Sequence, residues 1–270
     1  MNNDADDMKI SVLSSGSGGN VTYIETNQHK ILLDAGLSGV RIERLMASIN
    51  RSMKDVDMML VTHEHTDHSK AVGVLARRYP QISVYANQPT WDAMADTIGE
   101  VPLAQKNIFP PNMAMSFGDI DIESFAVSHD AAQAQFYNFH HRNKSFVVLT
   151  DVGYISDYIY GTIKNANTYL LECNHDVEML RSGDYPWSLK QRILGDEGHL
   201  SNEDGANTLM EAIGNSTDRI FIGHRSHHNN IKELAHLTVA SMLEENDFGV
   251  GTDFDLLDTD VEKSSDLFTL

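Results

Sequence analysis

The first fifty residues alternate between short apolar runs and polar turns. Residues 10–13, 21–25 and 30–34 are rich in valine, isoleucine and leucine, and residues 14–20 form a stretch of serine and glycine. Tight glycine turns between such runs predict strands joined as hairpins. The apolar positions of residues 40–50 recur at helical spacing instead, so the next element is predicted to be a helix.

The rest of the chain continues this mixture of strands and helices without a dividing linker. Further strands are predicted at residues 56–62, 82–86, 113–117, 120–127, 135–141, 145–150, 168–172, 219–222 and 248–257. Further helices are predicted at residues 69–79, 89–98, 155–166, 174–181, 186–193, 201–213 and 231–246, the helix 201–213 with Ser201 as its N-cap. Strand-rich stretches followed by helices in each half predict an α/β fold, and suggest two sheets with helices outside them. The pattern by itself establishes no more than an α/β fold of one domain. One domain is expected at residues 8–257, between a flexible acidic leader at 1–7 and a loose polar tail at 258–270.

The composition favours a cytoplasmic protein over a membrane or secreted one. No apolar run approaches the roughly 20 residues that span a bilayer, and no signal-peptide pattern opens the sequence. Cys173 is the single cysteine, so no internal disulfide can form. Its place after an apolar run predicts a buried thiol rather than a catalytic one. These features leave the oligomeric state open.

The formal net charge of −19 bears on the choice of partner. An acidic protein is a poor diffuse binder of nucleic acid, which needs lysine and arginine at the phosphates. The charge still leaves room for a local basic groove that binds one phosphodiester together with two metal cations. It also suits basic protein partners, or adaptation to a salty cytoplasm.

The densest candidate chemistry follows the strand predicted at residues 56–62. Three histidines and one aspartate fall within six residues, as His63, His65, Asp67 and His68. Imidazole and carboxylate are the ligands that a borderline divalent metal such as zinc prefers. A strand that ends in a short loop can aim all four side chains at one point, so a metal site is predicted here.

Three single residues elsewhere also come after a predicted apolar strand, as the cluster does. They are His129, Asp151 and His224. Strand ends can converge on one edge of a sandwich, so these side chains are predicted to complete the site. The competing interpretation is that a lone histidine at a strand end is a surface or core residue. For His224, the neighbours His227 and His228 are also rival ligands.

The order H-x-H-x-D-H at residues 63–68, followed by these three residues, resembles the metallo-β-lactamase superfamily. The resemblance implies an αββα four-layer sandwich of two mixed sheets flanked by helices. It also implies two divalent metal ions, with zinc as the first choice and manganese or iron as alternatives. The implied ligands are His63, His65 and His129 for one metal, Asp67, His68 and His224 for the other, and Asp151 between them. Such a pair activates water for hydrolysis, and Asp67 is expected to orient the attacking hydroxide as a catalytic residue.

A longer match narrows the resemblance. Residues 15–20, 171–176, 198–202 and 229–230 resemble the YycJ/WalJ/VicX-type group of that superfamily. This group implies a cytoplasmic phosphodiesterase with DNA as substrate, in the manner of an exonuclease. The chain departs from the group's commoner residues at Cys173 and at residues 224–228.

The phosphodiesterase branch also implies a proton donor. A histidine at the place of His199 is thought to protonate the leaving oxygen there, and Glu172 at the end of its strand is placed to orient it. Both are therefore candidate catalytic residues. The alternative is that His199 only caps the helix that follows it or hydrogen-bonds the backbone.

Candidate substrate contacts are Asn20, Arg225 and Asn229. Asn20 belongs to the serine–glycine turn, which lacks the Gly-Lys-Ser/Thr ending of a P-loop and is most simply a hairpin turn. Arg225 is a candidate for a phosphate-facing patch. Two other functions remain open: a lactonase or thioesterase of the same fold, because the same hydroxide attacks carbonyls, and a non-catalytic metal-binding regulatory accessory.

Overall fold

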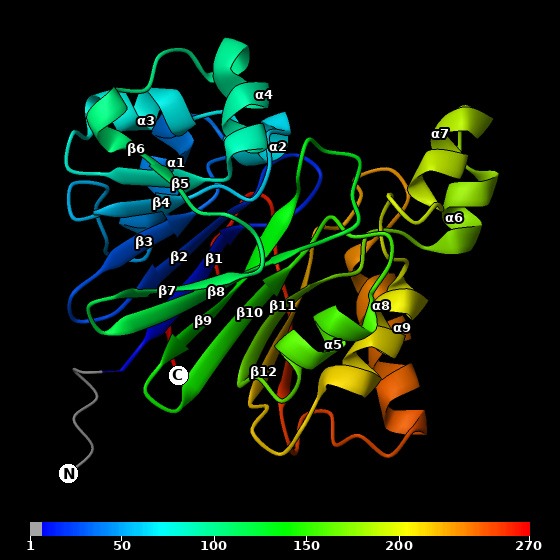
Figure 1. Cartoon of the computed structure of the whole chain (residues 1–270). Coiled ribbons are helices and arrows are strands. Elements are labelled where there is room, and N and C mark those ends of the chain that lie inside the picture. The colour runs from blue at the N-terminus through cyan, green and yellow to red at the C-terminus, as the bar shows by residue number, and fades with distance from the viewer. Residues whose placement is uncertain (1–6) are drawn as a thin grey trace.

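Two seven-stranded mixed sheets pack face to face, and helices cover the outer face of each (Figure 1). The structure is a computed structural model and describes residues 7–270. The leader expected at residues 1–7 therefore lies, but for its last residue, outside the described residues. The αββα sandwich implied by the ligand motif is confirmed.

The first sheet has the strand order β14-β1-β2-β3-β4-β5-β6. Its strands are β1 (Lys9–Ser14), β2 (Val21–Glu25), β3 (Lys30–Leu33), β4 (Met58–Leu60), β5 (Ser83–Ala86), β6 (Lys106–Ile108) and β14 (Phe268–Thr269). The helices that accompany it are α1 (Gly39–Ser48), α2 (Thr66–Ser69), α3 (Val72–Arg78) and α4 (Gln88–Ile98). β1 to β3 form an antiparallel meander, and β3 to β6 run parallel. Parallel neighbours need long crossovers, and these four helices lie in the crossovers that connect β3 to β6.

The second sheet has the strand order β13-β12-β11-β10-β9-β8-β7. Its strands are β7 (Met113–Phe117), β8 (Ile120–Ala126), β9 (Gln135–His141), β10 (Lys144–Leu149), β11 (Thr168–Glu172), β12 (Arg219–Gly223) and β13 (Asp255–Asp258). Its helices are α5 (Asp157–Ile163), α6 (Val177–Ser182), α7 (Trp187–Ile193), α8 (Asn202–Ala212) and α9 (Lys232–Glu245). α5, α8 and α9 cover the sheet, whereas α6 and α7 project from one end of the sandwich (Figure 1).

Apolar side chains form two cores. One lies between the sheets and continues under the second set of helices, with Ile10, Phe136 and Leu209 among its members. The other packs the first sheet against α1, α3 and α4, with Met59 and Trp91. Parallel strands such as β4 are buried along their whole length because both of their faces are covered.

Several element boundaries differ from the predictions near the histidine cluster. The strand expected at 56–62 is limited to β4, and the helix expected from residue 69 begins three residues later, at Val72. Asp67 and His68 were expected in a loop, but they lie in the one-turn helix α2. The N-cap at Ser201 is confirmed, and Asp204 completes a capping box with it.

The expectation of a loose C-terminal tail is wrong. The backbone N–H of Thr259 donates to Ile222 (3.2 Å), that of Ser265 to Val12 (2.9 Å) and that of Leu270 to Met8 (2.9 Å). β14 pairs antiparallel with β1, and the ring of Phe268 lies 5.6 Å from that of Phe221. Polar composition concealed this order, because the segment is held mainly through its backbone.

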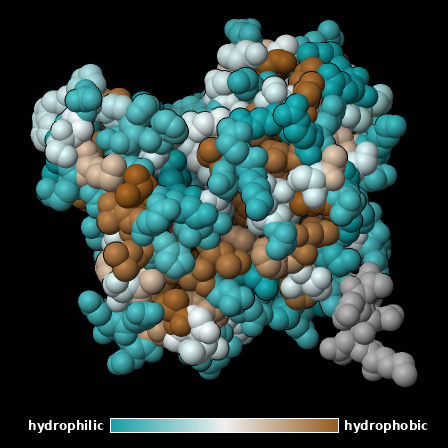
Figure 2. Space-filling view, turned by 180° about the vertical axis from the view of Figure 1, so that it is seen from behind, coloured by the Kyte–Doolittle hydropathy of each residue, from teal (hydrophilic) through white to brown (hydrophobic). Residues whose placement is uncertain are grey.

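Apolar and polar side chains are interspersed on the rear face of the molecule (Figure 2). Within residues 7–270, no helix combines the length and the apolar character that crossing a membrane requires.

Candidate metal centre

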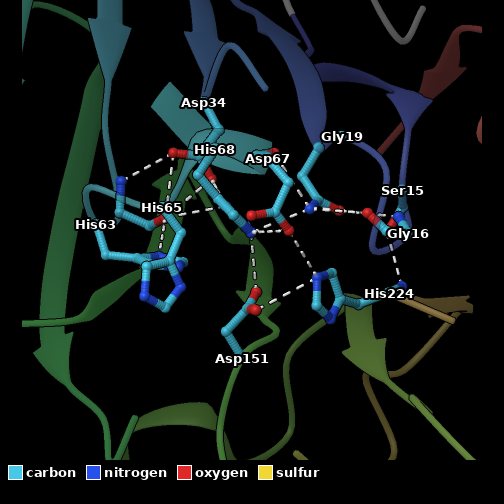
Figure 3. Close-up of polar contacts among 12 residues, drawn as sticks. Ser15, Gly16, Gly19, Asp34, His63, His65, Asp67, His68, Asp151 and His224 are labelled. Atoms are coloured by element: carbon cyan, nitrogen blue, oxygen red, sulfur yellow. Dashed lines mark hydrogen bonds and ion pairs between the residues drawn. The ribbon is translucent and has the colours of Figure 1, made fainter. Parts of the chain in front are cut away.

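The candidate site lies where strands of both sheets end. Asp34 follows β3, Asp151 lies two residues after β10, and His224 comes directly after β12. All three residues have a left-handed backbone, with φ of 60°, 50° and 52°. This conformation is uncommon for side chains other than glycine, asparagine and aspartate, and such residues gather at functional sites. Each strand thus ends in a sharp turn at the same edge, and Figure 3 shows the side chains facing one another.

The first donor set is His63, His65 and His129, whose ligand atoms lie within 4.8 Å of one another. The Nε2 atom of His129 is 3.4 Å from Nδ1 of His65. The His63 ring lies 4.7 Å from the His65 ring and 5.2 Å from the His129 ring, centroid to centroid. Residues from two sheets therefore present three imidazole nitrogens to one point.

The second donor set is Asp67, His68, Asp151 and His224. His68 Nε2 lies 3.1 Å from Asp151 Oδ2 and 3.6 Å from Asp67 Oδ2. His224 Nε2 lies 3.3 Å from Asp151 Oδ1 and 3.5 Å from Asp67 Oδ2. Oδ1 of Asp151 is also 3.8 Å from Nε2 of His129, so this carboxylate stands between the two sets.

Four histidines are oriented by partners at Nδ1. His63 contacts the Thr62 hydroxyl (2.9 Å) and His68 the carboxylate of Asp34 (2.7 Å). His129 donates to the carbonyl of Gly198 (3.2 Å), and His224 to the carboxylate of Glu172 (2.7 Å). An Nδ1–H engaged in this way leaves the Nε2 lone pair for a metal, which is the usual second contact of a metal-binding histidine.

The centre contains buried polar atoms whose hydrogen bonding within the protein is incomplete. Nε2 of His63 has no hydrogen-bond partner, and Nε2 of His224 and Oδ2 of Asp151 face only other ligand atoms of the second donor set, at 3.1–3.5 Å. Such atoms are costly unless something satisfies them. All three are ligand atoms of the kind that zinc, manganese and iron accept, so the residues fit a metal ion.

The charge balance also suits cations. Burial alone would lower the pKa of His68 and His224, but Asp151 and the neighbouring carboxylates outweigh it and raise the pKa of both. Burial lowers the pKa of His63 and His129, so these rings are neutral and keep a lone pair. One half of the centre therefore attracts positive charge, and the other offers neutral imidazole.

Glu172 links the centre to His199. Its Oε1 accepts from Nδ1 of His199 (2.8 Å), the same oxygen that His224 contacts, and its Oε2 accepts the backbone N–H groups of Val152 and Leu200 (3.1 Å each). Burial would raise the pKa of Glu172, but His199 and His224 lower it to about 2. A fully ionised carboxylate thus fixes His199, whose Nδ1 lies 3.9 Å from Asp151.

Asp34 is the residue that the sequence reasoning missed. It is buried, and its carboxylate accepts from His68 Nδ1 and from the backbone N–H (2.8 Å) and hydroxyl of Thr62. It follows β3 as Asp151 follows β10. This shared place at the end of a strand is the signal that could have found it.

The three candidate substrate contacts lie outside the donor sets. The Asn20 amide is buried and donates to the carbonyl of Gly16 (3.1 Å), with its nitrogen 3.0 Å from His68 Nε2. The Arg225 guanidinium donates to the carbonyls of Ile222 and Thr259, and Asn229 is buried. Asn20 therefore borders the centre, whereas Arg225 holds the C-terminal segment in place.

Gly36 leaves room for the backbone of α2. A Cβ at this position would lie 1.6 Å from the Asp67 carbonyl oxygen, which also accepts the backbone N–H of Asn20 (2.8 Å). Gly36→Ala is expected to displace Asp67 and to cost at least about 1–3 kcal/mol of folding free energy. Thermal unfolding and zinc titration measure both effects. Gly161→Ala, where a Cβ meets nothing within 4 Å, is the control; equal behaviour of the two variants would contradict the prediction.

Comparison with known proteins finds a family and relatives to which this chain is similar. Residues 29–224 match the family model described as "Beta-lactamase superfamily domain". The chain is 54% identical to exodeoxyribonuclease WalJ of Streptococcus pneumoniae strain D39 (96% of this chain, 97% of the relative). It is 51% identical to exodeoxyribonuclease YycJ of Bacillus anthracis (94% and 96%). Among solved structures, the metallo-β-lactamase fold protein YhfI from Bacillus subtilis superposes with a TM-score of 0.71 at 14% identity, covering 96% of this chain and 100% of that one.

Proposed function

The chain belongs to the β-lactamase superfamily, and from this membership we propose that it is a metal-dependent exodeoxyribonuclease. The observation that carries the proposal is the pairing of His199 with the buried Glu172 beside the donor sets. A thioester releases a weakly basic thiolate that needs no proton donor, whereas the phosphodiester of DNA releases an alkoxide that must be protonated. A lactone also releases an alkoxide, so the choice against a lactonase depends on the similar proteins. The names of the two similar exodeoxyribonucleases support the same substrate class.

We propose the metal ligands from the two donor sets. His63, His65 and His129 would hold one divalent ion, and Asp67, His68 and His224 the other, with Asp151 shared between them. We take zinc as the first choice, with manganese or iron as alternatives, because the sets mix imidazole and carboxylate. Bound metals would supply a hydroxide at neutral pH and polarise the phosphoryl oxygen.

The protein's own groups position the reaction. Asp67 is the most exposed member of the second donor set, with 27% of its side chain accessible. Its carboxylate can therefore accept a hydrogen bond from the attacking water. Glu172 holds Nδ1 of His199, which leaves Nε2 to donate a proton to the leaving oxygen. Attack and leaving-group protonation are thereby assigned to residues on different elements of the centre.

The test uses the purified protein loaded with zinc or manganese and an end-labelled DNA oligonucleotide. We expect stepwise release of nucleotides from one end, loss of activity with a chelator, and loss in Asp67→Ala and His68→Ala. Intact cleavage in both variants would overturn the proposal. Turnover of lactones or thioesters without any cleavage of DNA or bis(p-nitrophenyl) phosphate would replace it with a carbonyl hydrolase.

We place the enzyme in the cytoplasm, where DNA is accessible and thiols stay reduced. Cys173 is a free, buried cysteine, and burial raises the pKa of its thiol. Its burial directly after β11 fits the structural role predicted for it.

The pH dependence of DNA cleavage is expected to report on Glu172. Burial opposes protonation of His199, but Glu172 outweighs burial and raises the pKa of His199 above its ordinary value. Protonated His199 is then present below that raised pKa and is lost as pH rises through it. Glu172→Gln should lower the pKa and move the alkaline limb of kcat to lower pH. The pH–rate profile at saturating metal measures the limb, and an unmoved limb would contradict the role of Glu172.

A further inference from the structure

Two adjoining pockets lie beside the candidate metal centre, and together they are called the groove. The proximal pocket, about 180 Å³, is lined by Asp130, Arg192 and His199 among others. The distal pocket, about 580 Å³, is lined by His228 and Lys232 among others, and it falls within the roughly 300–1,000 Å³ usual for ligand sites. Both pockets are lined by Ser17, Tyr185 and Ser226, so they adjoin each other.

The walls of the groove are held in place. On one side Leu189, Arg192 and Ile193 share a face of α7 through their spacing of three and four residues. The buried Nζ of Lys190 donates to the carbonyls of Arg181 and Gly183 (2.7 Å each), which fixes the turn that leads to Tyr185.

The opposite wall joins two loops. The backbone N–H of His227 donates to the Ser17 hydroxyl (3.3 Å), and that of Ser17 to the Arg225 carbonyl (3.3 Å). This ties the glycine-rich turn to the loop after β12, from which His228 extends. The Tyr185 and His228 rings lie 5.8 Å apart at 62°, in the distal part of the groove.

We propose that this groove binds the single-stranded DNA on the leaving-group side of the scissile phosphate, with bases stacked on Tyr185 and His228. The inference rests on the proposed function: if His199 protonates the leaving oxygen, the leaving strand enters the pocket that His199 lines. Aromatic side chains stack on unpaired bases of any sequence, which suits an exonuclease.

The charges of the groove favour stacking over phosphate binding as the main contact. Arg192 is ion-paired with Asp130 at the proximal end, and the Arg225 guanidinium is engaged by backbone carbonyls. Lys232 is the exposed cation at the distal end. The carboxylate of Asp260, which accepts the backbone N–H of Glu262 (2.7 Å), lines the same pocket and adds negative charge there. Few cations are therefore available for phosphates, as expected for a chain of net charge −19.

The test compares Tyr185→Leu and His228→Ala on a single-stranded oligonucleotide and on bis(p-nitrophenyl) phosphate. Loss of one stacking ring should lower kcat/KM on the oligonucleotide on the order of tenfold more than on the small ester, whose leaving group is a single nitrophenolate. Tyr158→Leu, an exposed tyrosine on α5 outside the groove, is the matched control. Equal losses on both substrates, or no loss on either, would overturn the groove.

Binding separates this inference from the proposed function. Fluorescence anisotropy of a fluorescein-labelled oligothymidylate with phosphorothioate linkages, which resist cleavage, measures binding to the metal-loaded protein without turnover. A Kd that Tyr185→Leu weakens about tenfold, and that Tyr185→Phe restores, supports the groove even where no DNA is cleaved. The same Kd for wild type and Tyr185→Leu, or no binding by the wild type, overturns the groove even if DNA is cleaved.

Discussion

His199→Ala is expected to lower kcat for DNA cleavage by roughly 10²–10⁴-fold, the usual contribution of a positioned general acid. The alkoxide that leaves from DNA is a strong base, and Glu172 holds His199 in the orientation to protonate it. The donor sets are intact in this variant, so metal content should stay near that of the wild type. Steady-state kinetics on an oligonucleotide, with metal analysis of the same preparation, measure both.

The leaving group provides the control for this prediction. Nitrophenolate departs without protonation, so His199→Ala should reduce hydrolysis of bis(p-nitrophenyl) phosphate far less than that of DNA. His140→Ala removes a partly exposed histidine near the end of β9, outside the donor sets, and should leave both rates unchanged. A His199→Ala enzyme that loses the two activities equally would point to a structural role for the residue.

Asp34→Ala is expected to destabilise the fold by about 3–5 kcal/mol, because it leaves a buried histidine and a buried threonine without their partner. His68 loses the acceptor at Nδ1 that orients its ring, so zinc affinity should also fall by roughly 10–100-fold. Chemical denaturation measures the first effect, and zinc titration against a competing chelator the second. Asp34→Asn keeps an oxygen that can accept from Thr62, so it should cause smaller losses of stability and of zinc affinity. It replaces the alanine variant in both measurements if that variant does not fold.

A second aspartate–histidine pair is the matched control. Asp57 contacts Nδ1 of His29 at 2.6 Å, but its side chain is 37% exposed, and exposed pairs contribute at most about 1 kcal/mol. Asp57→Ala should therefore cost far less stability and leave zinc affinity unchanged. Equal losses of stability in the two alanine variants would contradict the prediction that the buried Asp34 carboxylate contributes more than the exposed one.

The metal centre could be predicted from the sequence because its members share a simple position. Each of His63, Asp151 and His224 comes shortly after a buried apolar strand, and strands that pack in two sheets end at one edge. Asp34 shares this position, but the ligand pattern implied by the family resemblance does not include it, so its place after β3 was not used to select it. The roles of all these residues as ligands stay predictions.

Elements defined by backbone contacts were harder to predict than those defined by apolar side chains. β6 carries a lysine and an asparagine, yet it pairs with β5 in parallel. β14 is only two residues long, and its pairing with β1 depends on a strand more than 250 positions earlier, as between Phe268 and Ile10. No local pattern marks such a contact, because its hydrogen bonds use groups that every residue has.

The same short strand bears on self-association. β1 is six residues long and almost entirely buried, and without β14 one of its edges would present free N–H and C=O groups to other chains. An exposed, apolar edge of this length is a template for intermolecular sheet formation. By pairing with β1, the last residues of the chain protect this edge from intermolecular sheet formation. We expect that a truncation or an affinity tag at this end lowers solubility even where catalytic activity is unchanged.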